Sequence, residues 1–207
     1  MSIIRPFKGI RPRADLASAI AALPYDVYNS EEAREIVAAE PKSFLQIDRA
    51  ETLLPKGTNP YSEAVYKTAS ETLNRMIDEG SFLQDKEPCY YLYALTMNGR
   101  TQTGLVGCAS IDDYCNNVIL KHENTLEAKE QDRIRHIDAC SAQTGPIFLA
   151  YRADKKLGEI IKNVRLTPEV YDFTSDDGIR HEGWRIDKMS TIVDISKIFE
   201  AIPHLYI

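Results

Sequence analysis

The sequence predicts an α+β fold, with a mixed, largely antiparallel sheet and flanking helices. Two hairpin patterns indicate the sheet, because residues 90–111 and 170–186 are rich in aromatic and β-branched side chains and are each interrupted by turn residues. The first turn is Asn98-Gly99, which supplies the positive φ angles that a two-residue hairpin turn requires. The segment from Ala64 to Ile77 carries apolar residues at helical spacing, which favours a helix.

Proline, glycine and capping residues set the expected boundaries in the first half of the chain. Asn59-Pro60 is typical of a helix start, because proline is favoured at the first helical position after an N-cap residue. Glycine and proline also end helices and interrupt strands. We therefore expect an extended segment at 3–12, a turn or short strand at 23–28, a helix capped by Ser30 and ended by Pro41, a strand at 43–48, and a helix from Asn59-Pro60 to Gly80.

The second half of the chain alternates strand and helix patterns. Apolar runs bounded by glycine or proline are typical of strands, and charged segments with helical spacing are typical of helices. We expect strands at 90–97 and 101–111, a charged helix after residue 125, a buried strand at 145–151, a helix at 155–163, a hairpin from 170–174 to 179–186 around Asp176-Asp177-Gly178, a helix at 191–201, and an apolar run at 204–207.

Length and charge limit the class of protein. The chain has 207 residues, of which 43% are hydrophobic, so it can bury a sizeable core as one large domain or two small ones. Its formal net charge is −6. Because non-specific nucleic-acid binding depends on a basic surface, nucleic acid is an unlikely partner.

Compartment and redox state follow from the same composition. No apolar run approaches the roughly 20 residues that a membrane span requires, and the N-terminus lacks a secretory signal pattern. We therefore expect a cytoplasmic protein with no membrane partner. The four cysteines form no C-x-x-C pair, so reduced, structural thiols are expected.

The most ionisable part of the sequence is Lys121-His122-Glu123 and the predicted helix that follows it. Residues three or four apart are neighbours on a helix, so Lys129, Arg133, His136 and Cys140 share one side. This side forms either the wall of a polar cleft or an ordinary solvated surface. The acids at the start of the helix complement the helix dipole, which is sufficient to explain them without a function.

A set of short motifs extends along the whole chain. They are Ile4 to Pro12, Pro24-Tyr25-Asp26-Val27, Ser43-Phe44-Leu45, Asn59-Pro60-Tyr61, Gly104 to Gly107, Asp113-Tyr114, Lys121-His122-Glu123 with Thr125, Lys129-Glu130 with Asp132-Arg133, Gly145-Pro146, His181 with Trp184, and Leu205-Tyr206-Ile207. In this order they resemble a bacterial and archaeal family known as domain of unknown function 1015.

The resemblance implies a larger protein. In full-length members, the sequence after Leu-Tyr-Ile continues into an Ala-Asp-Gly-His-His-Arg motif that looks like the phosphate-contacting signature of ParB and sulfiredoxin-type folds. Residues 1–207 would then be a single N-terminal region of the family, and the C-terminal segment of the same protein would be its partner. Members are often associated with serine biosynthesis genes, and ParB/sulfiredoxin-like proteins include nucleotide hydrolases and a kinase of free serine.

The leading hypothesis is therefore a nucleotide- or phosphate-dependent enzyme that acts on a small metabolite, with free serine or a similar hydroxyl compound as the substrate. The donor would be ATP, ADP or another phosphate compound with Mg²⁺. Such chemistry requires cations on the phosphates, acids on the metal and a base near the accepting hydroxyl. The sequence offers Glu123, His122 and Asp26 as catalytic residues, Arg5, Lys8, Lys121, Arg133 and His136 as cofactor-binding residues, and Glu123 and Glu127 as metal ligands.

Several of these residues also have structural interpretations. Arg11 is a further candidate phosphate-binding cation, but a solvated, exposed arm explains Arg5, Lys8 and Arg11 equally. Asp26 is equally typical of a turn, where its side chain bonds its own backbone.

Two other classes of function stay open. The first is a non-catalytic regulator that senses a nucleotide through the same cations. The second is a metal-dependent hydrolase built on His122, Glu123, Glu127 and His136. A His-Glu pair without the H-E-x-x-H spacing is a weak signal for a metal site.

Overall fold

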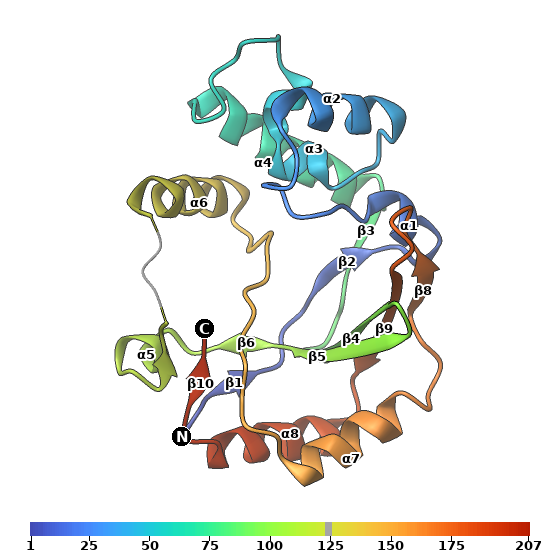
Figure 1. The fold of residues 1–207 in the computed structure, drawn as a ribbon, viewed down its shortest axis with the longest axis vertical. Helices are drawn as coiled ribbons and strands as arrows, with labels where there is room; N and C mark the ends of the chain where they lie inside the picture. The colour runs from blue at the N-terminus through green and yellow to red at the C-terminus, as the bar shows by residue number, and fades with distance from the viewer. Residues whose placement is uncertain (123–125) are drawn as a thin grey trace. The chain divides into compact units, whose positions relative to one another are not determined.

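A computed structural model of the chain describes residues 1–122 and 126–207 (Figure 1). The chain divides into two compact units, each assembled from separate segments. Unit 1 comprises Met1–Ala14, Gln84–Asn124 and Ile147–Ile207, and unit 2 comprises Asp15–Leu83 and Thr125–Pro146. Strands are concentrated in unit 1 and helices in unit 2, and most strand pairs are antiparallel, so the predicted α+β class is confirmed.

Unit 1 contains a four-stranded antiparallel sheet in the order β5-β4-β9-β8. Its strands are β4 (Tyr90–Met97), β5 (Arg100–Val106), β8 (Tyr171–Thr174) and β9 (Arg180–Ile186). Both predicted hairpins are therefore confirmed. Asn98 and Gly99 have φ angles of 51° and 75° between β4 and β5, which is the left-handed backbone that their sequence predicts.

Two helices cover one face of this sheet, α7 (Lys155–Val164) and α8 (Met189–Ala201), as Figure 1 shows. Side chains alternate across β4, so Tyr90, Leu92 and Ala94 are buried on the helix side. Leu92 lies opposite Trp184 of β9, which is buried on the same face. These residues form the core of unit 1 with Leu157 of α7 and with Ile192, Ile195 and Phe199 of α8.

Short pairings close the rest of unit 1. Its remaining elements are β1 (Ile4–Arg5), β2 (Ile10–Pro12), β6 (Cys108–Ala109), α5 (Ile111–Cys115), β7 (Ile119–Leu120) and β10 (Leu205–Tyr206). β1 pairs with β6 in antiparallel fashion, and β10 pairs with β7 in parallel. The apolar run at 204–207 thus contributes a strand, and the sheet content is mixed as predicted.

Unit 2 is helical, apart from β3 (Phe82–Gln84) at its boundary. It contains η1 (Ala14–Leu16), α1 (Ala17–Ile20), α2 (Ser30–Ala39), α3 (Leu45–Asp48), η2 (Ala50–Leu53), α4 (Glu63–Asp78) and α6 (Glu127–Cys140). The apolar stripe of α4 supplies Val65, Ala69, Leu73 and Met76 to the core, where Ile47 of α3 and Cys140 of α6 join them.

The starts of two of these helices differ from those predicted. The N-cap of α2 is Asn29 rather than Ser30. The Asn29 side chain accepts hydrogen bonds from two N–H groups of the first turn, as part of a capping box. Helix α4 begins at Glu63, after a turn in which the N–H of Ser62 donates to the carbonyl of Asn59. The motif Asn59-Pro60 therefore starts a turn that precedes the helix.

Three predicted strands differ in the structure. Within the predicted strand at 43–48, residues Leu45–Asp48 form helix α3, and the Ser43 hydroxyl accepts a hydrogen bond from the N–H of Leu45. So short a run does not distinguish strand from helix. The segment 145–151 has one isolated bridge, from Ala150 to Tyr206, and Phe148 is 70% exposed. The strand expected at 101–111 breaks at Gly107, after which β6 pairs with β1.

Among the described residues, no helix has the length and apolar character needed to cross a membrane. The cysteines Cys89, Cys108, Cys115 and Cys140 are free thiols.

Candidate functional site

A pocket of about 120 Å³ lies in unit 2. We call it the Asp48 pocket. Four parts of the unit supply its walls: the turn before α2, the end of α3 with the start of η2, the start of α4, and one side of α6. The lining residues are Tyr25, Asp48, Arg49, Glu51, Pro60, Tyr61, Val65, Tyr66, Asp132, Arg133 and His136.

Asp48 is the unusual group of the pocket. Its side chain is 16% exposed, and its Oδ1 atom is buried without a hydrogen-bond donor among the described residues. Burial raises the pKa of this carboxyl to about 6, although the positive charge of Arg133 and a hydrogen bond from Thr144 oppose the shift. A partly exposed carboxylate with a pKa close to neutrality is suited to take a proton from a ligand.

His136 lies beside this carboxyl on α6. Its Nε2 atom is 3.6 Å from Asp48 Oδ1, and its side chain is 4% exposed. Burial, and then the charge of Arg133, lower the pKa of the imidazole to about 4. His136 is therefore neutral at pH 7, and the two side chains meet as a carboxylate and an uncharged ring.

Cys140, one turn further along α6, does not complete a nucleophilic triad. Its Sγ atom is 3.8 Å from His136 Nε2, so the thiol and Asp48 approach the same ring nitrogen. In a triad, the nucleophile and the acid contact opposite nitrogens. Burial also raises the pKa of the Cys140 thiol to about 11, which keeps it protonated and unreactive.

Arg133 is the cation that faces Asp48. Its guanidinium donates to Asp132 Oδ2 through Nε (3.1 Å) and Nη2 (2.8 Å), and lies 4.2 Å from the ring centroid of Tyr25. The Tyr66 hydroxyl donates to Asp132 Oδ1 at 2.9 Å, and its pKa is raised to about 12 by burial and by this carboxylate. These contacts fix the position of Arg133, and its guanidinium is still partly exposed.

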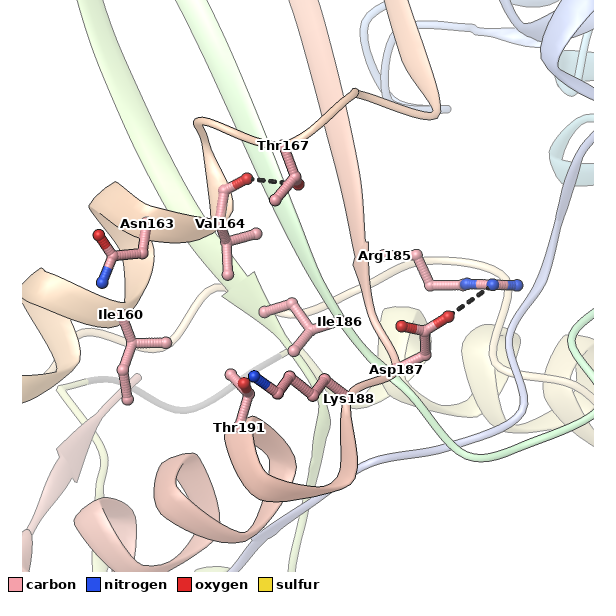
Figure 2. Close-up of a pocket in the computed structure, with 9 residues that line it drawn as sticks. All are labelled: Ile160, Asn163, Val164, Thr167, Arg185, Ile186, Asp187, Lys188 and Thr191. Carbon is pink, nitrogen blue, oxygen red and sulfur yellow. Dashed lines mark hydrogen bonds and ion pairs between the residues drawn. The ribbon is translucent and has the colours of Figure 1, made fainter.

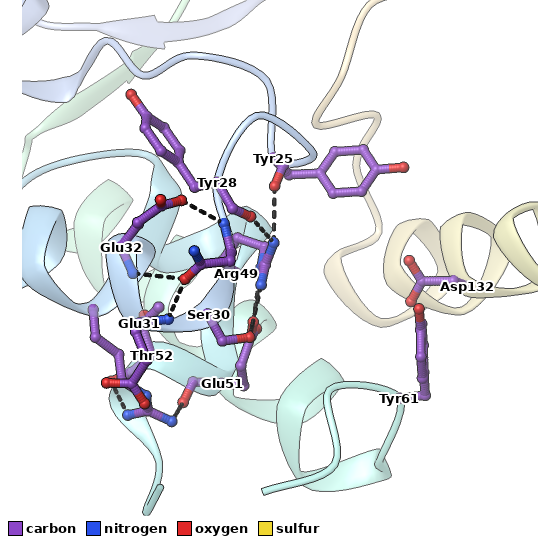
Figure 3. Close-up of polar contacts among 12 residues, drawn as sticks. Tyr25, Tyr28, Ser30, Glu31, Glu32, Arg49, Glu51, Thr52, Tyr61 and Asp132 are labelled. Carbon is purple, nitrogen blue, oxygen red and sulfur yellow. Dashed lines mark hydrogen bonds and ion pairs between the residues drawn. The ribbon is translucent and has the colours of Figure 1, made fainter. Parts of the chain in front are cut away.

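Arg49 has a structural role in the same wall (Figure 3). It donates to Glu51 Oε1 at 2.7 Å, to the carbonyl oxygens of Tyr25 and Tyr28 at 3.0 and 2.8 Å, and to the Ser30 hydroxyl at 2.9 Å. Its donors are thus occupied by protein acceptors. Arg49 holds the turn that carries Tyr25 against η2, and Arg133 is the cation with capacity for a ligand.

Comparison with protein-family models gives one result that covers nearly the whole chain. Residues 4–207 match the model described as "Protein of unknown function (DUF1015)". The chain belongs to the DUF1015 family. Comparisons with curated proteins and with solved structures give no match.

In this DUF1015 chain, two of the residues predicted from the sequence come together at the Asp48 pocket. Arg133 and His136 lie one helical turn apart on α6, and both line the pocket. Helical spacing predicts that they share one side of α6, and in the structure this side forms part of the pocket wall. Lys129 of the same predicted side is exposed and is not among the lining residues.

Three of the residues predicted in unit 1, Arg5, Lys121 and His122, have local partners there. Arg5 is exposed and forms an ion pair with Glu200 at 3.7 Å, and Lys8 is exposed between β1 and β2. The Lys121 ammonium lies 3.7 Å from the ring centroid of Tyr114. His122 Nδ1 forms a hydrogen bond with the carbonyl oxygen of Ile207. Their proposed roles in phosphate binding and catalysis stay predictions.

The remaining predicted residues lie outside the pocket lining. Asp26 is exposed in the turn in which the N–H of Val27 donates to the carbonyl of Pro24, and Glu127 is exposed at the first position of α6. Glu123 is outside the described residues. Within the described part of the chain, no group of three or more His, Cys, Asp or Glu side chains is arranged to hold a metal ion.

Arg11 is neither a free phosphate-binding cation nor a solvated arm. Its guanidinium donates to both oxygens of Asp85, at 2.9 and 3.1 Å, and Arg185 donates to Asp85 Oδ1 at 3.0 Å. Burial tends to raise the pKa of Asp85, but hydrogen bonds from Arg11, Tyr91 and Arg185 lower it to about 2. This network joins β2 to β4 and β9 within unit 1, which is a structural function.

No sequence pattern indicates Asp48, the central group of the pocket. It follows the segment Phe44-Leu45-Gln46-Ile47, and only its folded surroundings make it unusual. Tyr25 and Asp132 belong to motifs that carried the family resemblance, so those motifs did mark parts of the pocket.

Proposed function

We propose that the Asp48 pocket is the acceptor site of a phosphate-dependent enzyme that acts on a small hydroxyl metabolite. The observation that supports this is the Asp48 carboxyl, which lines the pocket, is 16% exposed and has a pKa raised to about 6. A substrate hydroxyl would donate a hydrogen bond to this carboxylate. As its proton passes to Asp48, the hydroxyl oxygen becomes a better nucleophile toward a phosphoryl group.

The pKa of Asp48 suits this role. A general base works best when its pKa lies near the working pH, because it is then both ionised and able to accept a proton. An ordinary aspartate, with a pKa near 3.9, would be a weaker base. His136 is neutral at pH 7, so it offers no positive charge that would lower the pKa of the Asp48 carboxyl.

The size of the pocket favours a small acceptor. About 120 Å³ corresponds to roughly four water molecules, since each occupies about 30 Å³ in the liquid. This is far below the roughly 300–1,000 Å³ of pockets that enclose drug-sized ligands. A molecule such as free serine is therefore the leading substrate, and the nucleotide part of a donor would lie elsewhere. Arg133 offers a planar cation for a carboxylate or phosphate group.

The donor proposed is ATP, ADP or another phosphate compound with Mg²⁺. Two carboxylates of the pocket, Glu51 and Asp132, are already paired with Arg49 and Arg133, so they do not form a magnesium site. Magnesium is commonly held by donor phosphates with only one or two protein carboxylates. The phosphate-binding roles predicted for Arg5, Lys8 and Lys121 of unit 1 stay predictions and are not part of this site.

A phosphotransfer assay tests the proposal. The chain is incubated with Mg²⁺, one of ATP, ADP or pyrophosphate, and free serine or a panel of small hydroxyl compounds, and the phosphorylated product is measured by ³¹P NMR. Asp48→Asn should lower turnover by roughly 10²- to 10⁴-fold, the usual contribution of a general base. Asp138→Asn, an exposed position on α6, is the matched control and should leave turnover unchanged.

The other outcomes separate the classes of function. Ligand binding without product, measured by calorimetry in the same mixtures, would replace the enzyme with the nucleotide-sensing regulator. The assay is repeated with a chain extended through the C-terminal segment that the family resemblance implies. Absence of both turnover and binding in the two chains would reject the Asp48 pocket as a site.

A further inference from the structure

A second and larger pocket, of about 450 Å³, lies within unit 1 (Figure 2). It is formed by one side of α7, the end of β9 and the first turn of α8. We call it the Lys188 pocket. Its volume falls within the range of roughly 300–1,000 Å³ that is typical of small-molecule sites. Neither the family match nor the proposed function uses it.

One side of the Lys188 pocket is apolar. Ile160 and Val164 lie one turn apart on α7, and Ile186 at the end of β9 points toward them, as Figure 2 shows. Ile160 and Val164 are only partly buried against the core of unit 1, so they still present surface to the pocket. An apolar group bound there would remove this surface from water at a gain of roughly 25 cal/mol per Å².

The opposite side is polar and carries an uncompensated positive charge. Lys188 and Thr191 lie at the start of α8, and the Lys188 side chain extends across Thr191 beneath Ile186 in Figure 2. In the described part of the chain, Lys188 makes no ion pair. The first turn of a helix also favours negative charge, because its N–H groups have no intrahelical acceptors.

The other charges near the pocket cancel one another. Arg185 donates to Asp85 at 3.0 Å and to Asp187 at 2.6 Å, and Arg11 is bound to the same Asp85. The charges of Arg11 and Arg185 are thus balanced by those of Asp85 and Asp187. The positive charge of Lys188 is left unbalanced. The pocket therefore combines an apolar floor with one available cation.

From this combination we infer that the Lys188 pocket binds a small amphipathic organic anion, in which one carboxylate or phosphate group is attached to an apolar body. The anion contacts Lys188 and the start of α8, and the apolar body packs on Ile160, Val164 and Ile186. At about 450 Å³, the pocket has the volume of roughly 15 water molecules, enough for a body of several carbon atoms. This site is separate from the acceptor site proposed in unit 2.

The chain contains its own reporter for this pocket. Trp184 is the only tryptophan, and its indole N–H donates to the carbonyl oxygen of Thr167 at 3.1 Å. Thr167 is part of the pocket lining. A ligand that displaces water there should change the environment of Trp184 and hence its fluorescence.

Octanoate is the probe for the test. It is titrated into the protein while Trp184 fluorescence is followed, and the methyl resonances of Ile160, Val164 and Ile186 are recorded by NMR. We expect saturable binding at one site, with shifts at these three methyl groups. The uncharged analogue 1-octanol and inorganic phosphate should each bind more weakly than octanoate, because each lacks one of the two features recognised.

Matched variants test the role of the charge. Lys188→Gln should weaken octanoate binding by roughly tenfold or more, the usual effect of removing a charge-assisted contact. Lys197→Gln removes the same charge from an exposed position of the same helix and should leave the affinity unchanged. Equal effects of the two variants, equal binding of octanol, or no methyl shifts with octanoate would overturn the inference. This test does not depend on whether the phosphotransfer assay of the Asp48 pocket detects turnover.

Discussion

Asp48 and His136 form a pair in which the usual order of acidity is inverted. Their side chains approach to 3.6 Å, and burial raises the pKa of the carboxyl to about 6 while it lowers the pKa of the imidazole to about 4. Between these values the protonated acid and the neutral ring coexist, so the pair is uncharged. An ion pair in the same place would need compensation for the loss of hydration, which the pocket does not supply.

This inversion predicts an unusual dependence of stability on pH. The raised pKa of Asp48 means that the folded state holds a proton that the unfolded state releases near pH 4, so this group lowers stability as pH rises from about 4 to about 6. The lowered pKa of His136 has the opposite effect between about 4 and 6.5. Each pKa differs by roughly two from its ordinary value, so each group changes the free energy of unfolding by roughly 3 kcal/mol. The two changes have opposite signs and largely cancel.

Asp48→Asn should expose the contribution of His136. In this variant the free energy of unfolding, measured by urea titration, should rise by up to roughly 3 kcal/mol between pH 4 and 6.5. His136→Gln should show the reverse, a fall between pH 4 and 6. Arg133, Asp132 and Cys140 also face the pair and stay unchanged in both variants. Parallel pH profiles for wild type and both variants would contradict the inverted order.

Arg49→Ala should destabilise unit 2 strongly. It removes the donors that bind Glu51 and the turn at Tyr25 and Tyr28, and it leaves Glu51, which is 3% exposed, as an unpaired buried charge. Breaking a buried pair in this way costs roughly 3–5 kcal/mol in unfolding free energy. Lys56→Ala breaks the exposed pair with Glu31 and is the control, for which no measurable change is expected.

Local turn and helix chemistry explains why much of the fold could be predicted. Asn98-Gly99 and Asp176-Asp177-Gly178 favour one backbone geometry whatever surrounds them, and both hairpins formed there. Residues 43–48 and 145–151 lack such signals. Their apolar composition fits a buried helix, a strand or an extended segment, and long-range packing decides among these.

The site was predictable only in part, for a related reason. Arg133 and His136 share a helix face, which the spacing of residues reveals. Asp48 comes from a distant part of the sequence, and its properties arise from burial, which the sequence of its neighbours does not show. The structural role of Arg11 is not predictable from the sequence either, because its partner Asp85 is also distant along the chain.

The thiols should divide into two classes of reactivity. Cys108 and Cys115 are exposed, whereas Cys89 and Cys140 are buried. Burial raises the pKa of Cys89, Cys108 and Cys140, so exposure rather than pKa separates the two classes. Iodoacetamide should modify Cys108 and Cys115 in the native protein, and the other two only in urea. Mass spectrometry of digested protein measures this, and modification of Cys140 in the native state would argue against its packing beside His136.

Gly107→Ala should destabilise unit 1 because the backbone there touches the core. An added Cβ atom would lie 2.8 Å from Ile4 Cγ2 and 2.9 Å from Tyr90 Cε1, so these buried side chains would have to move. We expect a loss of roughly 1–3 kcal/mol in unfolding free energy. Gly158→Ala in α7 meets no atom within 4 Å and should instead stabilise the helix by roughly 0.5–1 kcal/mol. Similar changes in the two variants would contradict this account.

The Ser2 hydroxyl donates to the carbonyl oxygen of Ile202 at 2.8 Å, which joins residues at the two ends of unit 1. During synthesis at roughly 5–20 residues per second, the start of the chain must therefore wait some tens of seconds for this acceptor to emerge from the ribosome. Throughout that interval β1 and the apolar side chains of β4 lack the cover of α8. Unit 1 therefore closes only after synthesis has passed residue 202.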